Sequence, residues 1–216
     1  MALNGVSVVT TTWNERENIK KLIPLIRNVL RDVRHEVIVV DDGSPDGTVQ
    51  AAKRFADVVV EKRREGQSKG LLYGMKLAKY PIIVTIDADL ENNPEQIPEL
   101  VQKTVEFDVV VTSRTKLPRI SEKIASKTLG KAVGVKDVFS NFRAYRKETV
   151  SSFELKGGET FGAEFLMIAK KKGFKIGEVT YEELTRREHP RIGGKIKANL
   201  RITWASVKSL IIYLIY

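Results

Sequence analysis

The chain has 216 residues, a formal net charge of +10, no cysteine and two histidines, His35 and His189. These counts exclude disulfides, thiolate chemistry, a histidine metal cluster and a Ser–His relay, so any catalysis rests on carboxylates, hydroxyls and cations. With no signal peptide and no apolar run near the roughly 20 residues that span a bilayer, the sequence indicates one large domain, soluble or peripheral and cytosol-facing.

The first half of the chain alternates short apolar runs with helical patterns. The runs, typical of strands buried on both faces, cover residues 6–12, 36–42, 81–89 and 108–114. Apolar residues at helical spacing between Ile19 and Val33 predict a first helix, in which Pro24 should cause a kink or a delayed start. Shorter helical patterns cover residues 48–55, 68–79 and 95–107. This alternation predicts an α/β fold with a mainly parallel, Rossmann-like sheet flanked by helices.

The alternation breaks down after Arg114. A basic segment over 115–136, helical or mobile, precedes a strand over 141–147, a helix over about 159–172 and a strand over about 175–181. Residues 114–147 carry ten Lys and Arg against two Asp and Glu, and residues 186–216 carry seven against one. This clustering predicts an anionic partner, such as phosphate groups, an acidic membrane surface or nucleic acid, with a merely solvated surface as the alternative.

Polar residues follow four of the predicted strands. Ligands of open α/β sheets bind outside the carboxyl ends of the strands. This rule gathers around one crevice the segments Trp13–Glu15, Asp41–Asp42, Asp87–Asp89 and Ser113–Arg114.

The carboxylates of this crevice suit a metal and a nucleotide. Asp87 and Asp89 offer two hard oxygen ligands of the kind that binds Mg²⁺ or Mn²⁺. Alternatively, Asp89 or Asn93 is simply the cap of a helix that starts at Pro94. Asp42 at another strand tip can accept hydrogen bonds from a nucleobase or a ribose, although an isolated strand–turn–helix is often only structural.

Three ordered segments carry a resemblance to a known family. They are TTTWNERENI (10–19), VVDDGSPDGT (39–48) and IDADLENNPE (86–95). In order and spacing they resemble the polyprenyl-phosphate sugar synthases of the dolichyl-phosphate mannose synthase type, which are family-two glycosyltransferases with the GT-A fold. The resemblance implies a GT-A domain over 1–197, with 115–136 as its acceptor and interface segment. Residues 198–216 remain as a C-terminal helix for a membrane interface or a dimer contact.

The resemblance implies a nucleotide-sugar site at the strand ends. Asp89 is the implied direct metal ligand, beside Asp87, and Glu91 stands where a Gln ligand is common. Asp89 and Arg114 are the implied catalytic residues. The residues implied to bind the nucleotide sugar are Thr11, Trp13, Glu15, Val40, Asp42, Asp87, Ala88 and Asp89, with Arg186 or Arg187 and Lys195 closing over the diphosphate. Gly66, Gly70 and Gly74 resemble a glycine-rich segment near the donor, but close packing of a helix on the sheet also explains them.

An acceptor-phosphate site is implied next to the donor. Arg114 matches a phosphate-binding arginine, and Ser126 matches an acceptor-phosphate serine. The arginine usual four residues before that serine is Glu122 here, so Lys123 is the expected substitute, as a point charge rather than a bidentate fork. Ser140 is implied to shape the acceptor side, with a structural role as the alternative.

The C-terminal segment has an amphipathic pattern. Apolar residues at helical spacing are Ile196, Leu200, Trp204, Val207, Ile211 and Leu214. The closing residues 210–216 rise only about 10 Å as a helix, too little for a hydrocarbon core of about 30 Å. A basic helix that carries a tryptophan can lie in a membrane interface; core packing or a homodimer contact is the alternative.

Residues and resemblance together predict a metal-dependent, inverting glycosyltransferase. It would move a hexose, mannose or glucose, from a GDP- or UDP-sugar to a polyprenyl or dolichyl phosphate, peripherally at the cytoplasmic face of a membrane. A related transferase with a hydroxyl acceptor would need Glu164 as a base. A basic nucleic-acid-binding module is the non-enzyme alternative, but it leaves the carboxylate motifs unexplained, so no nucleic-acid partner is expected.

Overall fold

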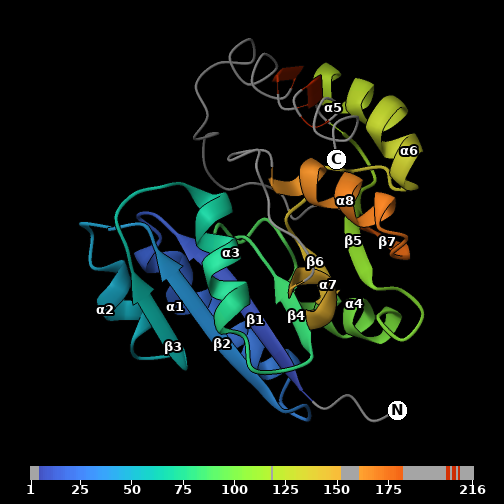
Figure 1. Ribbon diagram of the computed structural model, residues 1–216. Coiled ribbons are helices and arrows are strands. Elements are labelled where there is room, and N and C mark those ends of the chain that lie inside the picture. The colour runs from blue at the N-terminus through green and yellow to red at the C-terminus, as the bar shows by residue number, and fades with distance from the viewer. Residues whose placement is uncertain are drawn as a thin grey trace.

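A computed structural model of the protein describes residues 5–117, 119–151 and 161–181, and five residues between 203 and 209. In this part of the chain, seven strands form one sheet of order β3-β2-β1-β4-β6-β5-β7 (Figure 1). The strands are β1 (Val6–Thr12), β2 (His35–Asp41), β3 (Val58–Glu61), β4 (Ile82–Thr85), β5 (Val109–Arg114), β6 (Arg143–Arg146) and β7 (Ile176–Tyr181). Neighbouring strands pair in parallel except at β6, which is antiparallel to β4 and β5.

Helices cover both faces of the sheet. They are α1 (Arg16–Val29), α2 (Thr48–Ala52), α3 (Gln67–Leu77), α4 (Ile97–Lys103), α5 (Ile120–Ala125), α6 (Lys131–Val133), α7 (Lys147–Ser151) and α8 (Phe161–Lys171), with the short turns η1 (Pro94–Gln96) and η2 (Ser126–Gly130). The α/β fold with a mainly parallel sheet is confirmed. Pro24 lies inside α1, which begins at Arg16, so the expectation that it delays the start of the helix is wrong.

Alternation along β1 divides the core into two layers. Val6 and Val8 pack on one face with the buried side of α1, whereas Val9 packs on the other face with α3 and α8. Side chains on a strand point alternately to the two faces, so a strand buried on both faces reads as an unbroken apolar run. This is why the central strands were visible in the sequence.

Two glycines bring α3 close to the sheet. A Cβ atom on Gly74 would lie 2.4 Å from Cγ1 of Val9, and one on Gly70 would lie 2.8 Å from Cγ2 of Thr11. Both distances are too short for real contacts, so only glycine permits this approach. The packing interpretation of these two glycines is confirmed.

The strand that carries the paired aspartates is shorter than expected. β4 ends at Thr85, and the amide of Ile86 makes a last bond to the carbonyl of Val9 (3.1 Å) before the chain turns away. The expectation of a strand that reaches residue 89 is wrong. Asp87 and Asp89 lie in the segment that follows the strand, where the local turn, rather than strand alternation, directs their side chains.

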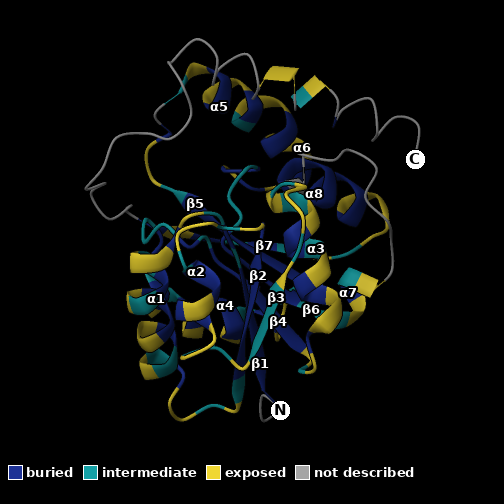
Figure 2. Ribbon diagram, turned by 90° about the vertical axis from the view of Figure 1, so that its left-hand side faces the viewer, coloured by how far each residue is buried: buried dark blue, intermediate teal, exposed yellow. Residues whose placement is uncertain are grey.

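The basic segment lies beside a few described residues near the end of the sequence. Figures 1 and 2 both show the described residues between 203 and 209 next to the layer that contains α5 and α6. Ile120 and Ile124 on α5 are 71% and 57% exposed, and Trp204 is 68% exposed. Among the described helices, none is long and apolar enough to cross a membrane.

Candidate active site

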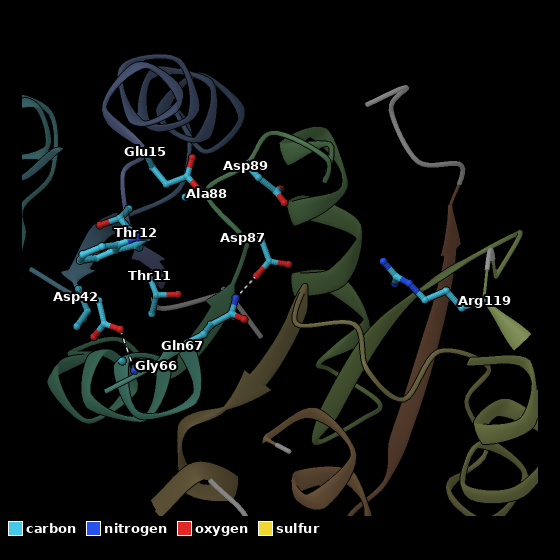
Figure 3. A pocket seen from close by; sticks show the side chains of 13 residues that line it. Thr11, Thr12, Glu15, Asp42, Gly66, Gln67, Asp87, Ala88, Asp89 and Arg119 are labelled. Carbon is cyan, nitrogen blue, oxygen red and sulfur yellow. Dashed lines mark hydrogen bonds between the residues drawn. The ribbon is translucent and has the colours of Figure 1, made fainter. Parts of the chain in front are cut away.

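One pocket opens at the carboxyl ends of β1, β2 and β4 (Figure 3). Its volume of about 320 Å³ falls at the low end of the range for small-molecule sites. The pocket is lined by Thr11, Thr12, Trp13, Glu15, Val40, Asp42, Gly66, Gln67, Gly70, Asp87, Ala88, Asp89 and Arg119. Eight residues at or after the ends of β1, β2 and β4 were expected to bind a nucleotide sugar. All eight line this one pocket.

Asp42 lies at the β2 side of this pocket. Its carboxylate accepts hydrogen bonds from Nζ of Lys62 and from the amides of Gly66 (2.8 Å) and Glu65 (3.3 Å). Burial alone would raise the pKa of Asp42, but the bonds from Lys62 and the two amides outweigh it and lower that pKa. Asp42 thus remains an ionised acceptor in a fixed orientation.

The neighbouring Asp41 has a different task. Its carboxylate accepts bonds from the hydroxyl of Thr12 (2.7 Å) and from the amides of Gly43 (3.0 Å) and Ser44 (2.7 Å). These contacts tie the end of β2 to the end of β1 and hold the turn that follows. Asp41 therefore shapes the pocket without lining it.

Asp87 and Asp89 form the centre of the pocket. Oδ1 of Asp87 accepts a hydrogen bond from Nε2 of Gln67 (2.5 Å), and Oδ1 of Asp89 accepts one from the amide of Glu91 (3.1 Å). Burial raises the pKa of Asp87 to about 7, and the carboxylates of Asp89 and Glu91 contribute to the rise. The side chain that caps η1 is Asn93, which accepts from the amide of Glu95 (3.1 Å). Asp89 is therefore not the cap of that helical turn.

This carboxylate pair fits a divalent cation. The pKa of Asp87 is raised mainly by burial, with a further contribution from the carboxylates of Asp89 and Glu91, so a bound cation would favour the ionised form of this residue. The described part of the chain holds no group of three His, Asp or Glu side chains arranged for a metal. Two carboxylates without a complete protein cage suit Mg²⁺ or Mn²⁺, which retains waters and takes ligands from phosphates. Glu91 does not complete such a group, and its role as a ligand stays a prediction.

The β1 side of the pocket carries an aromatic ring and a second acid. The guanidinium of Arg64 lies over the ring of Trp13, 3.8 Å from its centroid. Glu15 is buried; its amide donates to the hydroxyl of Thr48 (3.0 Å), and its carboxylate accepts from Nδ2 of Asn18 (2.7 Å). These contacts fix the segment after β1 against the start of α2.

The expected acceptor residues lie outside the pocket lining. Nε of Arg114 lies 2.5 Å from Oδ2 of Asp137, and its Nη2 lies 3.3 Å from Oε1 of Glu122. β6 separates β5 from β4 in the sheet, which moves Ser113 and Arg114 away from the aspartates. Ser113 and Arg114 therefore do not line this pocket, and the role of Arg114 at the acceptor phosphate stays a prediction.

Three other expected residues of the acceptor side also have different surroundings. Lys123 is exposed on α5, and Ser126 starts η2 immediately after that helix. Oγ of Ser140 lies 2.9 Å from Oγ1 of Thr112 and accepts from the amide of Phe142 (3.3 Å). For Ser140 these bonds favour the structural alternative.

Some predicted residues cannot be placed with the rest. Arg186, Arg187 and Lys195 lie outside the described residues. Glu164, the base of the hydroxyl-acceptor alternative, is fully buried in α8 and does not line the pocket.

Four residues of the site were not expected from the sequence: Thr12, Gln67 and Arg119, which line the pocket, and Lys62, which bonds Asp42. Lys62, the partner of Asp42, directly follows β3, so the strand-end rule would have found it had that short strand been recognised. Arg119 lines the pocket from the residue before α5. In the sequence, only the position of Arg119 within the basic segment 115–136 indicates an anionic ligand. The other Lys and Arg residues of that segment share this feature, so it does not identify Arg119.

The family model described as Glycosyl transferase family 2 matches residues 7–175. The chain belongs to this family. It is 34% identical over 198 residues to a dolichol-phosphate mannosyltransferase of Pyrococcus furiosus, covering 82% of this chain and 55% of that protein. It is 32% identical over 167 residues to an undecaprenyl-phosphate 4-deoxy-4-formamido-L-arabinose transferase of Pseudomonas fluorescens, covering 69% and 49%. The chain thus spans about half the length of these curated relatives.

Solved structures place this family 2 domain in the GT-A fold. Glucosyl-3-phosphoglycerate synthase of Mycobacterium tuberculosis, crystallised with Mn²⁺, UDP and glucosyl-3-phosphoglycerate, matches with a TM-score of 0.79. The match covers 97% of this chain and 80% of that chain at 22% identity. The same enzyme with Mg²⁺ and UDP gives a TM-score of 0.77 at 23% identity, over 95% and 79%. At such identity the likeness concerns the fold, and the GT-A prediction is confirmed.

Proposed function

We propose that this domain transfers a hexose from a nucleotide sugar to a polyprenyl phosphate. The observation that carries the proposal is the meeting of three strand-end motifs, around Trp13, Asp42 and Asp89, in one pocket. The two curated relatives that match at 32–34% identity are named for transfer to dolichol phosphate and undecaprenyl phosphate. The proposed donor is a GDP- or UDP-hexose, with mannose or glucose as the sugar.

The residues of the pocket divide the work of donor binding. Asp42, kept ionised and oriented by Lys62, accepts hydrogen bonds from the nucleoside, and Trp13 lies along the same end. Asp87 and Asp89 are proposed to hold Mg²⁺ or Mn²⁺, the cations with which the structural neighbours were crystallised. When bound, the cation would neutralise charge that develops on the departing diphosphate.

The transfer itself needs no strong base. An oxygen of the acceptor phosphate bonds to the anomeric carbon of the sugar, while the bond from that carbon to the diphosphate breaks and its electron pair leaves with the nucleoside diphosphate. Attack opposite the leaving group inverts the configuration. A phosphate is already ionised at neutral pH, so no proton has to be removed. A hydroxyl acceptor would need a base, and the burial of Glu164 outside the pocket gives that alternative no support.

An exposed apolar surface supports a membrane-bound acceptor. We define the interface surface as α5 together with the described residues 203–209. It exposes Ile120, Ile124 and Trp204, and Lys123 on α5 is exposed as well. Apolar side chains mixed with cations suit the headgroup region of an anionic bilayer. The proposal places this surface on a cytoplasmic face, which is consistent with a chain of 216 residues without cysteine.

A donor-by-acceptor screen tests the proposal. The purified chain is incubated with radiolabelled GDP-mannose, UDP-glucose and other sugar nucleotides, with Mg²⁺ or Mn²⁺, and with polyprenyl phosphate or the free polyprenol. The proposal expects label in the organic phase with at least one donor, only with the phosphorylated lipid. Transfer to the free alcohol, or no transfer to polyprenyl phosphate from any donor, would overturn it.

A further inference from the structure

We infer that Arg119 binds the phosphate of the acceptor and that Glu122 is the residue that positions it. The inference rests on the proposed function and names the cation that the acceptor side of the site requires. Among the described residues that line the pocket, Arg119 is the one Lys or Arg. Its guanidinium points into the pocket from the start of α5 (Figure 3).

A buried carboxylate holds Arg119 in place. Oε1 of Glu122 accepts a hydrogen bond from Nη1 of Arg119 (2.7 Å), and Oε2 accepts one from the Arg119 amide (3.1 Å). The side chain of Glu122 is 3% exposed, whereas that of Arg119 is 29% exposed. The acid is thus part of the protein interior, while the cation that it holds reaches the pocket. Such a clamp reduces the conformational entropy that Arg119 loses when it binds an anion.

Behind Arg119, the described ion pairs form a row of alternating cations and acids. Glu122 also lies 3.3 Å from Nη2 of Arg114, which in turn bonds Asp137 at 2.5 Å. Two arginines therefore face two buried acids, and Arg119 is the more exposed of the two cations. A dianionic phosphate in the pocket would meet Arg119 first, and Arg114 would act from behind it.

The position of Arg119 along the pocket favours the acceptor over the donor. In Figure 3, Asp87 lies between Asp42 at one end and Arg119 at the other. With the nucleoside at Asp42 and the diphosphate at the aspartate pair, the space on the far side is left for the group that attacks the sugar. A phosphate there is repelled by Asp87 and Asp89 unless a cation compensates them, and Arg119 adds a second positive charge.

Arg119 also accounts for the departure at position 122. An arginine was expected where Glu122 stands, with Lys123 as its substitute, but Lys123 is exposed and does not line the pocket. In this chain the side chain of Glu122 is buried, and Arg119, three residues before it, supplies the positive charge at the pocket. Arg119 can offer two parallel N–H groups to a phosphate, which the ammonium of Lys123 cannot.

Steady-state kinetics with a short, water-dispersible acceptor, farnesyl phosphate, test this inference without a contribution from membrane docking. Arg119→Ala should raise the KM for farnesyl phosphate by about 10- to 100-fold, the range of a lost charge-assisted hydrogen bond. The KM for the sugar nucleotide should stay within about twofold. Lys76→Ala, which removes an exposed cation of α3 outside both the pocket lining and the interface surface, is the control and should leave both values unchanged.

Two further variants separate binding from positioning. Arg119→Lys keeps the charge and should recover part of the acceptor affinity. Glu122→Gln should raise the acceptor KM while the thermal unfolding temperature and the binding of nucleoside diphosphate with Mn²⁺ confirm a folded donor site. The inference would be overturned if Arg119→Ala left the acceptor KM unchanged, if it raised the donor KM equally, or if Lys76→Ala had the same effect on the acceptor KM. A wild-type chain that is inactive on every polyprenyl phosphate overturns the proposed function instead.

Discussion

Asp42 and Asp87 line the same pocket but have opposite electrostatic settings. Burial opposes ionisation at both, yet Asp42 receives bonds from Lys62 and two amides, and its pKa falls. Asp87 receives a bond from the neutral Gln67 and faces other carboxylates, so its pKa rises to about 7. The negative charge of Asp42, at one end of the pocket, is therefore compensated by groups of the protein. The carboxylates of Asp87 and Asp89, at the centre of the pocket, suit a bound cation.

The compensation at Asp42 predicts a pH-dependent effect of Asp42→Asn on stability. Because the folded protein lowers the pKa of the Asp42 carboxyl below its ordinary value of 3.8, the ionised form contributes stability above about pH 4. This stability is lost as the pH falls through the folded pKa. We expect Asp42→Asn to lower the free energy of unfolding by about 1 kcal/mol at pH 7. Urea unfolding should show this gap narrowing below pH 4. A gap that stays constant from pH 7 to pH 3.5, or an equal effect from the exposed control Asp32→Asn, would contradict this.

At the scale of elements, the fit between α3 and β1 determines the shape of the pocket. Gly70 and Gly74 let the helix approach the strand, and the same helix carries Gln67, which bonds Asp87. Gly70 also lines the pocket itself. Packing in this layer and the orientation of a central carboxylate are therefore linked through one helix.

Gly74→Ala should be destabilising although alanine favours helices. The higher helix propensity contributes about 1 kcal/mol in favour of alanine, whereas overpacking typically costs 1–3 kcal/mol. The new Cβ would lie 2.4 Å from a buried Val9 methyl and 3.1 Å from one of Val40. We expect a net loss of about 1 kcal/mol in chemical unfolding. Ser68→Ala on the same helix gains propensity without that contact and should be neutral or stabilising; equal effects of both substitutions would refute the packing argument.

The elements differ in how well the sequence predicted them. β1 and β2 are buried on both faces, so the sequence shows them as apolar runs that end in polar residues. The residues at the ends of these strands line the pocket, as expected. β3 has four partly exposed residues at the edge of the sheet and was missed, and Lys62 with it. The antiparallel insertion of β6 depends on pairing between distant segments, which local pattern does not encode. Arg114 was therefore misplaced and Arg119 overlooked.

At the scale of the whole molecule, the interface surface lies next to the pocket. Arg119 lines the pocket and is followed directly by α5, which carries the exposed Ile120 and Ile124. The described residues between 203 and 209 lie beside that helix (Figure 2), and among them Trp204 is exposed. A polyprenyl chain could thus remain in a bilayer while its phosphate reaches Arg119.

Liposome flotation tests this arrangement. The chain should float with vesicles that contain anionic lipid, and high salt should weaken flotation without abolishing it, since each cation near the surface contributes about 1 kcal/mol and the apolar contribution is not screened. The double variant Ile120→Ser, Trp204→Ser should float poorly. Val105→Ser, which changes an exposed apolar residue after α4, is the control. If the double variant floats like the wild type, or the wild type does not float, core or dimer contacts explain the surface better.

We propose that the three strand-end motifs build one site for a nucleoside diphosphate and a divalent cation. Calorimetric titration of GDP and UDP in the presence of Mg²⁺, Mn²⁺ or EDTA measures it most directly, with Asp89→Ala alongside the wild type. We predict that a cation tightens the binding of at least one of the two nucleotides by about tenfold or more, a difference of about 1.4 kcal/mol. Asp89→Ala should lose this gain while its unfolding temperature stays close to that of the wild type. Equal affinity in Mg²⁺, Mn²⁺ and EDTA would contradict the account.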